Sequence, residues 1–134
     1  MAFSEKYLKR LASFEKALKK FQNFLTLNLD LEVLIEVASK RFEYIYETMW
    51  KVMKLYLSEV KGIDCNSPLD CFKSAYQFGI IPENYEQVFI EMVKLRNEIV
   101  HIYNEEIALN IYHKIVPEYI NAMIVVYENL KKEM

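Results

Sequence analysis

The chain has 134 residues, of which 53% are apolar and 14% aromatic, and it contains only 2 glycines and 3 prolines. This composition excludes disordered and collagen-like chains, and two widely separated glycines exclude the Gly-rich phosphate-binding loops of nucleotide-binding folds. With 17 basic and 19 acidic side chains the net charge is −2. The chain therefore has no overall positive field to attract nucleic acid, and any contact with RNA has to be local.

The first half of the sequence predicts two long helices. Apolar residues recur every three or four positions over residues 7–25, which predicts an amphipathic helix with Ser4 as its N-cap. After a short connection, Asp30 is expected to cap a second helix. The same apolar spacing then runs over residues 31–60. Gly62 is expected to end this helix in the left-handed conformation.

The second half predicts a short helix and two further main ones. A capping serine, Ser67, is followed by a proline, which predicts the start of a short connecting helix that ends at Gly79. The apolar spacing then predicts a helix over residues 82–102 and another over 104–130. Pro117 lies inside the last pattern, so we expect either a kink or two abutting helices there.

The predicted fold class is all-α, an antiparallel up-and-down four-helix bundle with a short extra connecting helix. No internal repeat or linker interrupts residues 1–134, which are expected to form a single domain. No apolar run approaches the roughly 20 residues that a membrane span requires, so no membrane association is expected. The location expected is cytoplasmic, with Cys65 and Cys71 as reduced thiols.

The polar side chains of one segment differ from the lysines and glutamates spread over the other helix faces. Arg96, Asn97 and His101 lie on one polar flank of the predicted helix. Histidine can take a proton from a ribose 2′-OH, arginine suits the charge of a phosphorane-like transition state, and asparagine can orient either group. Such a set can cleave RNA without a metal, although an acid–base pair of histidines needs two subunits.

Two other interpretations of this segment remain. In the first, Arg96 forms an ion pair with Glu98 and His101 caps the helix end, with no catalysis. In the second, Glu98 and His101 form half of a di-iron site, but the residue three before His113 is Asn110, so the second half is missing. No metal and no cofactor are therefore expected.

Two segments resemble a known family. Residues 96–103, RNEIVHIY, resemble the R-x4-H-x-Y signature of HEPN domains, the partners of minimal nucleotidyltransferases. Residues 41–57 resemble the FE-x-x-YE-x-x-WK-x-x-K-x-YL helix of the nucleotidyltransferase substrate-binding-protein branch, with Tyr44 as an extra tyrosine. Pro68, Lys73-Ser74-Ala75 and Gly79-Ile80-Ile81 fall where that branch carries P…K-x-A…G-L-I.

The resemblance implies a function in a two-gene system. Members form up-and-down bundles that pair as homodimers, and many act with a separate minimal nucleotidyltransferase. In type VII toxin–antitoxin versions the HEPN subunit is a metal-independent endoribonuclease, and its partner neutralises it by AMPylation of a tyrosine. Carried over to this sequence, Arg96 and His101 are the catalytic pair, Asn97 supports them, and Tyr103 is the modified residue.

Two further functions stay open. The chain could be a non-catalytic substrate-binding subunit of a split nucleotidyltransferase, or a bundle that only dimerises and acts as a scaffold. The role of Trp50 is also open, with packing on the bundle favoured over anchoring a partner. The basic side chains of the first helix are expected to be a solvated face, although such charges can also contact RNA phosphates.

Overall fold

The computed structural model describes residues 3–99 and 105–134, apart from the side chains of residues 99, 105, 107 and 116. Within these ranges every regular element is helical, which confirms the all-α prediction. The elements in chain order are α1 (Glu5–Phe24), α2 (Leu31–Lys61), α3 (Pro68–Gln77), a 3-10 turn (Glu83–Tyr85), α4 (Glu86–Ile99), α5 (Glu105–Lys114), a π-helical turn (Ile115–Tyr119) and α6 (Ile120–Lys132).

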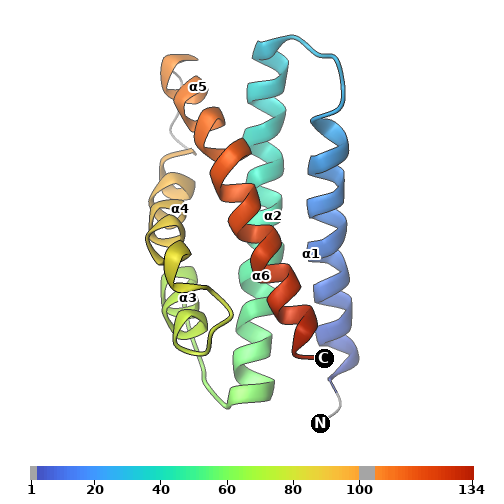
Figure 1. The fold of residues 1–134 in the computed structure, drawn as a ribbon, viewed down its shortest axis with the longest axis vertical. Coiled ribbons are helices and arrows are strands. Elements are labelled where there is room, and N and C mark those ends of the chain that lie inside the picture. Colours follow the sequence, from blue (N-terminus) through green and yellow to red (C-terminus); the bar gives the residue numbers. More distant parts are fainter. Residues whose placement is uncertain (1–2, 100–104) are drawn as a thin grey trace.

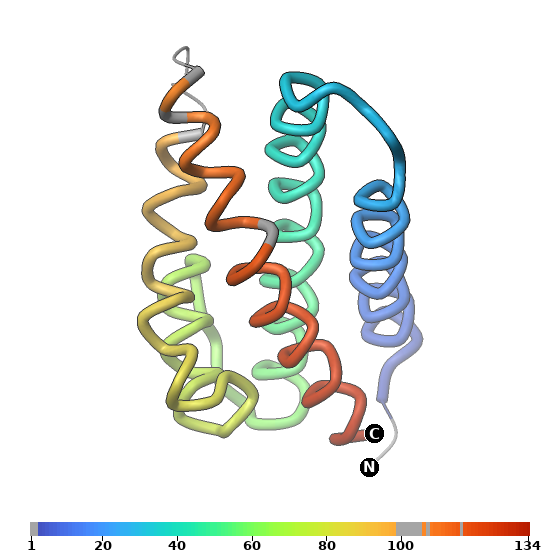
Figure 2. The backbone as a smooth tube through the Cα atoms, turned by 45° about the horizontal axis from the view of Figure 1, so that its top comes forward, coloured from blue at the N-terminus to red at the C-terminus, as the bar shows by residue number. Residues whose placement is uncertain are grey.

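The long helix α2 occupies the centre of the bundle. Figure 1 shows α1 beside it on one side, α3 and α4 on the other, and α6 crossing it obliquely. Figure 2 shows from a second angle that the two termini lie at the same end of the molecule. Because α2 contacts elements on both sides, its residues decide how the two halves of the bundle meet.

Local signals set the ends of α1 and α2 largely as expected. The Ser4 side chain accepts a hydrogen bond from the backbone N–H of Tyr7 at 3.0 Å, which confirms it as the N-cap of α1. Gly62 has a φ of 67° and ends α2 in the left-handed region. Asp30 occupies the N-cap position of α2, but its side chain makes no capping hydrogen bond.

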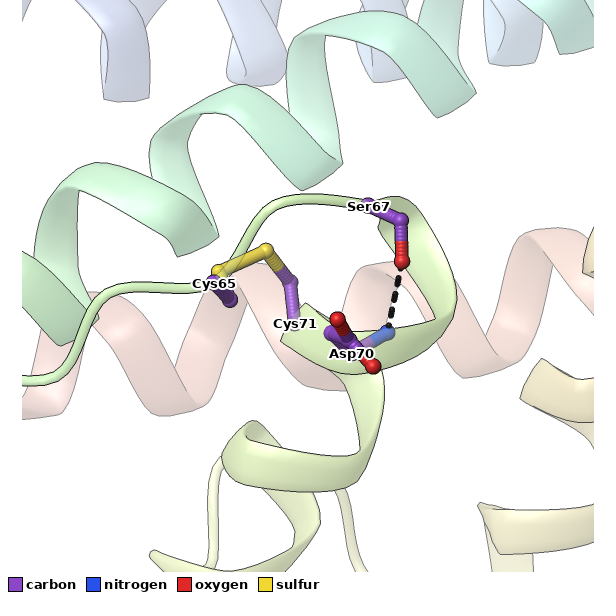
Figure 3. The surroundings of a disulfide bond; sticks show 4 residues. All are labelled: Cys65, Ser67, Asp70 and Cys71. Atoms are coloured by element: carbon purple, nitrogen blue, oxygen red, sulfur yellow. Dashed lines mark hydrogen bonds between the residues drawn. A yellow bond between two sulfur atoms is a disulfide. The ribbon is translucent and has the colours of Figure 1, made fainter.

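The start of α3 confirms one prediction and corrects another. Ser67 accepts a hydrogen bond from the backbone N–H of Asp70 at 3.2 Å and caps α3 (Figure 3). Cys65 and Cys71 are joined by a disulfide, so the expectation of two reduced thiols was wrong. The turn before α3 folds back and brings the two Cα atoms to 5.2 Å, within the usual range for a disulfide, which spacing along the sequence could not indicate.

The last two helices abut through a widened turn at Pro117. This residue lies within the π-helical turn, and α5 and α6 lie on either side of it, as the prediction of two abutting helices requires. Proline lacks a backbone N–H and cannot continue regular helical hydrogen bonding. The helix predicted over residues 82–102 begins as a 3-10 turn and continues as α4, while its last three residues lie outside the described ranges.

The interior is a single apolar cluster rich in aromatic rings, and no charged or strongly polar residue is buried in it among the described residues. Phe42 of α2 lies between two other rings, with centroids 6.0 Å from Tyr46 and 5.9 Å from Tyr119. Tyr46 in turn packs edge-on against Phe72 of α3. These contacts hold the second half of the chain against α2. No helix in the described ranges is long and apolar enough to cross a membrane.

Candidate functional site

The candidate site lies where the last turn of α4 meets the middle of α2. One face of α4 is buried through Phe89, Met92 and Leu95, and Phe89 packs edge-on against Phe72 at a centroid distance of 5.1 Å. Arg96 follows directly on this buried face and is half-buried. The packing of α4 therefore presents Arg96 to α2 and leaves part of its side chain open to solvent.

The partner of Arg96 is Glu47, and this carboxylate also contacts two neighbours on its own helix. Nη2 of Arg96 lies 3.6 Å from Oε1 of Glu47. Trp50 donates a hydrogen bond from Nε1 to Oε2 of Glu47 at 3.2 Å, and the Nζ of Lys51 lies 3.9 Å from the same oxygen. We call these four residues the Glu47 cluster. The carboxylate thus joins the arginine of α4 to the tryptophan of α2.

The ion pair leaves Arg96 with binding capacity. The Arg96 and Glu47 side chains are 35% and 36% exposed, so neither charge is strongly desolvated and both can be reached from solvent. Nε of Arg96 is buried and has no hydrogen-bond partner in the described structure. Below the pair, burial raises the pKa of the Tyr46 hydroxyl, and the positive charge of Arg96 opposes that rise. The exposed part of the guanidinium is therefore a local positive charge at the surface, whereas its unpaired Nε–H is buried.

The structure places some of the expected site residues and not others. Arg96 pairs with Glu47 of α2, and not with Glu98 of its own helix as one interpretation had it. Asn97 is exposed beside it, where it is free to contact a ligand. His101 and Tyr103 lie outside the described residues. Glu47 lies within the segment 41–57 that resembles the family helix, but its place in the site could not be predicted, because a pairing between distant helices leaves no trace in local spacing.

Trp50 is half-buried against the apolar cluster, which agrees with the packing role that was favoured. Its indole N–H is satisfied by Glu47, as expected for a tryptophan at the edge of a core. No group of three or more potential metal ligands occurs among the described residues. Arg96 and Asn97 offer positive charge and hydrogen-bonding groups at this site.

A hollow lies between α3 and α4 and has a volume of about 290 Å³. Its floor contains the apolar residues Phe72 and Phe89, and its rim carries Lys73, Tyr76 and Glu86. The carboxylate of Glu86 raises the pKa of the Tyr76 hydroxyl through its charge and a hydrogen bond. An apolar floor with a few polar groups at the rim is typical of a small-molecule site, although this volume is at the lower limit for one.

Comparison with known proteins gives a family for this arrangement. Residues 9–132 match the model of the family described as nucleotidyltransferase substrate binding protein like. A crystal structure of a protein from Thermus thermophilus is similar, with a TM-score of 0.80 and 31% sequence identity over 88% of this chain and 98% of that one. None of the curated proteins matches. The chain belongs to the nucleotidyltransferase substrate binding protein-like family.

Proposed function

We propose that this chain is the HEPN subunit of a two-gene system, in which it acts as a metal-independent endoribonuclease toxin and a cognate minimal nucleotidyltransferase neutralises it. The whole chain, residues 1–134, forms the HEPN domain. Membership of a family named for nucleotidyltransferase substrate binding supports the choice of partner. The single observation that carries the proposal is the half-exposed guanidinium of Arg96, held at the end of α4 at the start of the R-x4-H-x-Y motif.

The proposed reaction uses two copies of the chain, because each copy supplies one motif histidine. His101 removes the proton of a ribose 2′-OH, and the oxygen attacks the adjacent phosphorus. The bond from phosphorus to the 5′ oxygen breaks, and the partner subunit's His101 gives a proton to that leaving oxygen. The products are a 2′,3′-cyclic phosphate and a free 5′-OH. Arg96 stabilises the added negative charge on the phosphoryl oxygens, and Asn97 orients the phosphate.

Control of this activity is assigned to Tyr103, which follows the motif histidine by two positions. The nucleotidyltransferase transfers AMP from ATP to the tyrosine hydroxyl, and pyrophosphate leaves. The new phosphodiester places negative charge and an adenosine next to Arg96 and His101. This group blocks an RNA phosphate by repulsion and by bulk.

The test compares the purified chain with two variants. RNA incubated with the parent protein in EDTA is expected to be cleaved to products with cyclic phosphate ends, and His101→Ala and Arg96→Ala are each expected to lower the rate by at least about a hundredfold. Coexpression with the transferase encoded beside the gene is expected to add the mass of AMP, and Tyr103→Phe removes this addition. Cleavage that survives His101→Ala, or that requires added metal, contradicts the proposal.

The hollow between α3 and α4 favours a second candidate, a non-catalytic substrate-binding subunit of a split nucleotidyltransferase. In this function the hollow receives a small molecule, and the partner chain transfers the nucleotide to that molecule instead of Tyr103. Radiolabelled ATP separates the two functions, because the label ends on the protein in the first and on a small molecule in the second. A lack of RNA cleavage together with a labelled small molecule selects the second function.

A further inference from the structure

Five cations lie along one side of α1. Lys9 is ion-paired with Glu5, and we call the other four the basic strip: Lys6, Arg10, Lys16 and Lys20. At about 100° and 1.5 Å per residue they fall within an arc of about 120° and extend over about 21 Å of helix. The three lysines are exposed and the arginine is half-buried. The strip is therefore a nearly linear array of positive charge on an otherwise weakly acidic protein.

The charges of the basic strip are not neutralised by neighbouring carboxylates. The two acidic residues of α1 pair with other lysines, Glu5 with Lys9 at 3.2 Å and Glu15 with Lys19 at 3.1 Å. None of the four strip residues forms an ion pair with an acidic side chain in the part of the chain that the structure describes. A ligand that brings negative charge would therefore not have to displace an internal partner.

Contacts of α1 show which way the strip faces. Tyr127 of α6 donates a hydrogen bond to Glu15, so this flank of α1 faces α6. Lys16 and Lys20 lie about 100° and 140° further round the helix. The basic strip therefore lies on the side of α1 that faces away from α6.

The Glu47 cluster likewise faces away from α6 and the π-helical turn that precedes it. Phe42 of α2 packs on Tyr119 of the π-helical turn, and Glu47 lies about 140° round α2 from Phe42. Tyr44, which is 55% exposed, lies one turn before Glu47 on α2. The strip on α1, the exposed ring of Tyr44 and the ion pair of Arg96 thus follow one another across the side of the bundle opposite α6.

The composition of this surface favours a nucleic acid strand over a protein or a membrane. Protein interfaces are depleted in lysine and are centred on apolar anchors, and no large apolar side chain lies among the strip residues. Membrane-bound amphipathic helices bury an apolar face in lipid, whereas the apolar face of α1 is buried in the bundle. Proteins that bind single-stranded nucleic acid combine cations placed along the phosphate backbone with an aromatic ring on which a base stacks.

We propose that the basic strip and Tyr44 bind single-stranded RNA and lead the strand across α2 to Arg96. The strip contacts successive phosphates, and one base stacks on the ring of Tyr44. This inference deepens the proposed ribonuclease function and rests on it for the choice of RNA. Its readout is binding of a strand that cannot be cleaved, so its outcome is independent of whether the protein cuts RNA.

The experiment measures binding of a fluorescent 12-nucleotide 2′-O-methyl RNA in EDTA by anisotropy. The strip variant carries Lys6→Gln, Arg10→Gln, Lys16→Gln and Lys20→Gln. The control variant carries Lys61→Gln, Lys114→Gln, Lys131→Gln and Lys132→Gln and has the same net charge. Circular dichroism and the urea midpoint establish that both variants are folded.

If the strip makes four phosphate contacts, the affinity of the parent protein should fall about fiftyfold between 50 and 200 mM salt. The reason is that the logarithm of the binding constant falls with the logarithm of the salt concentration with a slope of about 0.7 per contact on single strands. The strip variant is expected to bind weakly at both salt concentrations with little salt dependence, whereas the control variant keeps the parental slope. Tyr44→Ala is expected to weaken binding by about tenfold without changing the slope. A DNA strand of the same sequence should bind within about tenfold of the RNA, since phosphates carry the contact.

Any one of three results in the binding experiment would overturn the inference, and a fourth result would come from the transferase partner. The parent protein does not bind the strand, the strip variant binds like the parent, or the strip and control variants lose affinity equally. In the last case net charge, and not the position of the four cations, decides binding. Loss of binding to the transferase partner with RNA binding intact would also overturn it, because the strip would then be a protein interface. RNA cleavage that fails while strip-dependent binding holds contradicts the ribonuclease function alone.

Discussion

The α1–α2 half and the α4–α6 half of the molecule build their helices differently. The first half has two long, uninterrupted helices of 20 and 31 residues, with a side-chain cap at Ser4 and a left-handed glycine at Gly62. The second half has shorter helices, begun by a 3-10 turn and divided by a π-helical turn. Local sequence signals thus set the helix ends in the α1–α2 half, whereas the α4–α6 half contains turns that depart from regular α-helix.

The difference shows which half of the molecule supports the other. The central helix α2 supplies a rigid apolar surface, and the second half packs on it through rings such as Tyr119 and Phe72. Arg96 lies in the second half, at the end of α4, and widened helical turns are frequent near functional sites. We infer that the first half, with its regular helices, serves as the scaffold for the second half, while Glu47 gives it a part in the site as well.

Removal of the ring that joins the two halves is expected to have the largest effect on stability. Phe42 is fully buried between Tyr46 and Tyr119, so Phe42→Ala should lower the free energy of unfolding by about 3–5 kcal/mol. Urea denaturation followed by circular dichroism measures the loss. Phe78→Ala is the matched control, since Phe78 is 38% exposed and should lose much less. Equal losses would contradict the view that the halves are held together at Phe42.

Reduction of the disulfide tests the connection between the halves. The bond closes a short loop before α3, and opening it should lower the free energy of unfolding by about 2 kcal/mol through the greater entropy of the unfolded chain. Urea denaturation curves recorded with and without dithiothreitol measure this difference in the free energy of unfolding. The Cys65→Ala, Cys71→Ala double variant should not respond to the reductant. An unchanged midpoint in the parent would show that the two cysteines do not form the bond.

The free energy of unfolding measured as a function of pH tests whether α1 contributes to the stability of the scaffold. Burial, together with the carboxylates of Glu133 and Glu59, raises the pKa of the Tyr7 hydroxyl from 10.0 to about 12. Above pH 10 the unfolded chain loses this proton while the folded chain keeps it, so the free energy of unfolding falls as pH rises towards 12. Tyr7→Phe should reduce this fall.

The same substitution has a second expected result at neutral pH. The Tyr7 hydroxyl is buried without a hydrogen-bond partner in the described structure, so Tyr7→Phe should leave stability unchanged or raise it by up to about 1 kcal/mol. The exposed Tyr44→Phe is the control and should alter neither quantity. A loss of more than about 1 kcal/mol in Tyr7→Phe would show that the hydroxyl has a structural partner.

The smallest effect is expected at the ion pair between the halves. Glu47→Gln removes a charge pair that is about one-third exposed, so the free energy of unfolding should change by less than about 1 kcal/mol. The control is Glu36→Gln, which breaks an exposed pair within α2 and should change it less. Chemical denaturation at low and high salt measures both. A large loss at Glu47 would assign the Glu47 cluster to the scaffold instead of the site.

Much of the fold could be predicted from the sequence because its signals are local. The serine caps at Ser4 and Ser67, the left-handed Gly62 and the break at Pro117 each act within one or two helical turns, and the structure confirms them. The expectation for the two cysteines failed, because their pairing depends on how the chain turns back before α3. The local sequence pattern could not predict that this turn brings the two cysteines together.

The residues of the candidate site also fall into those that could be predicted from the sequence and those that could not. Arg96 and Asn97 could be selected from the sequence, since their residue types and spacing already indicate phosphate chemistry. The partner of Arg96 could not, because Glu47 lies 49 positions earlier and meets it only when α4 packs on α2. The neighbouring Glu98, which the non-catalytic interpretation paired with Arg96, forms no ion pair with it in the described structure.

By itself the sequence determined an all-helical chain, most of its helix ends and the choice of Arg96 and Asn97 as candidate site residues. Hydrogen bonding within a helix and the burial of one apolar face depend on residues only a few positions apart, so they can be deduced from spacing. Only the tertiary structure decided the disulfide, the pairing of Arg96 with Glu47 and the common side on which the basic strip and that pair lie. These features depend on how separate helices rotate and pack against one another, which is set by the fit of the whole core.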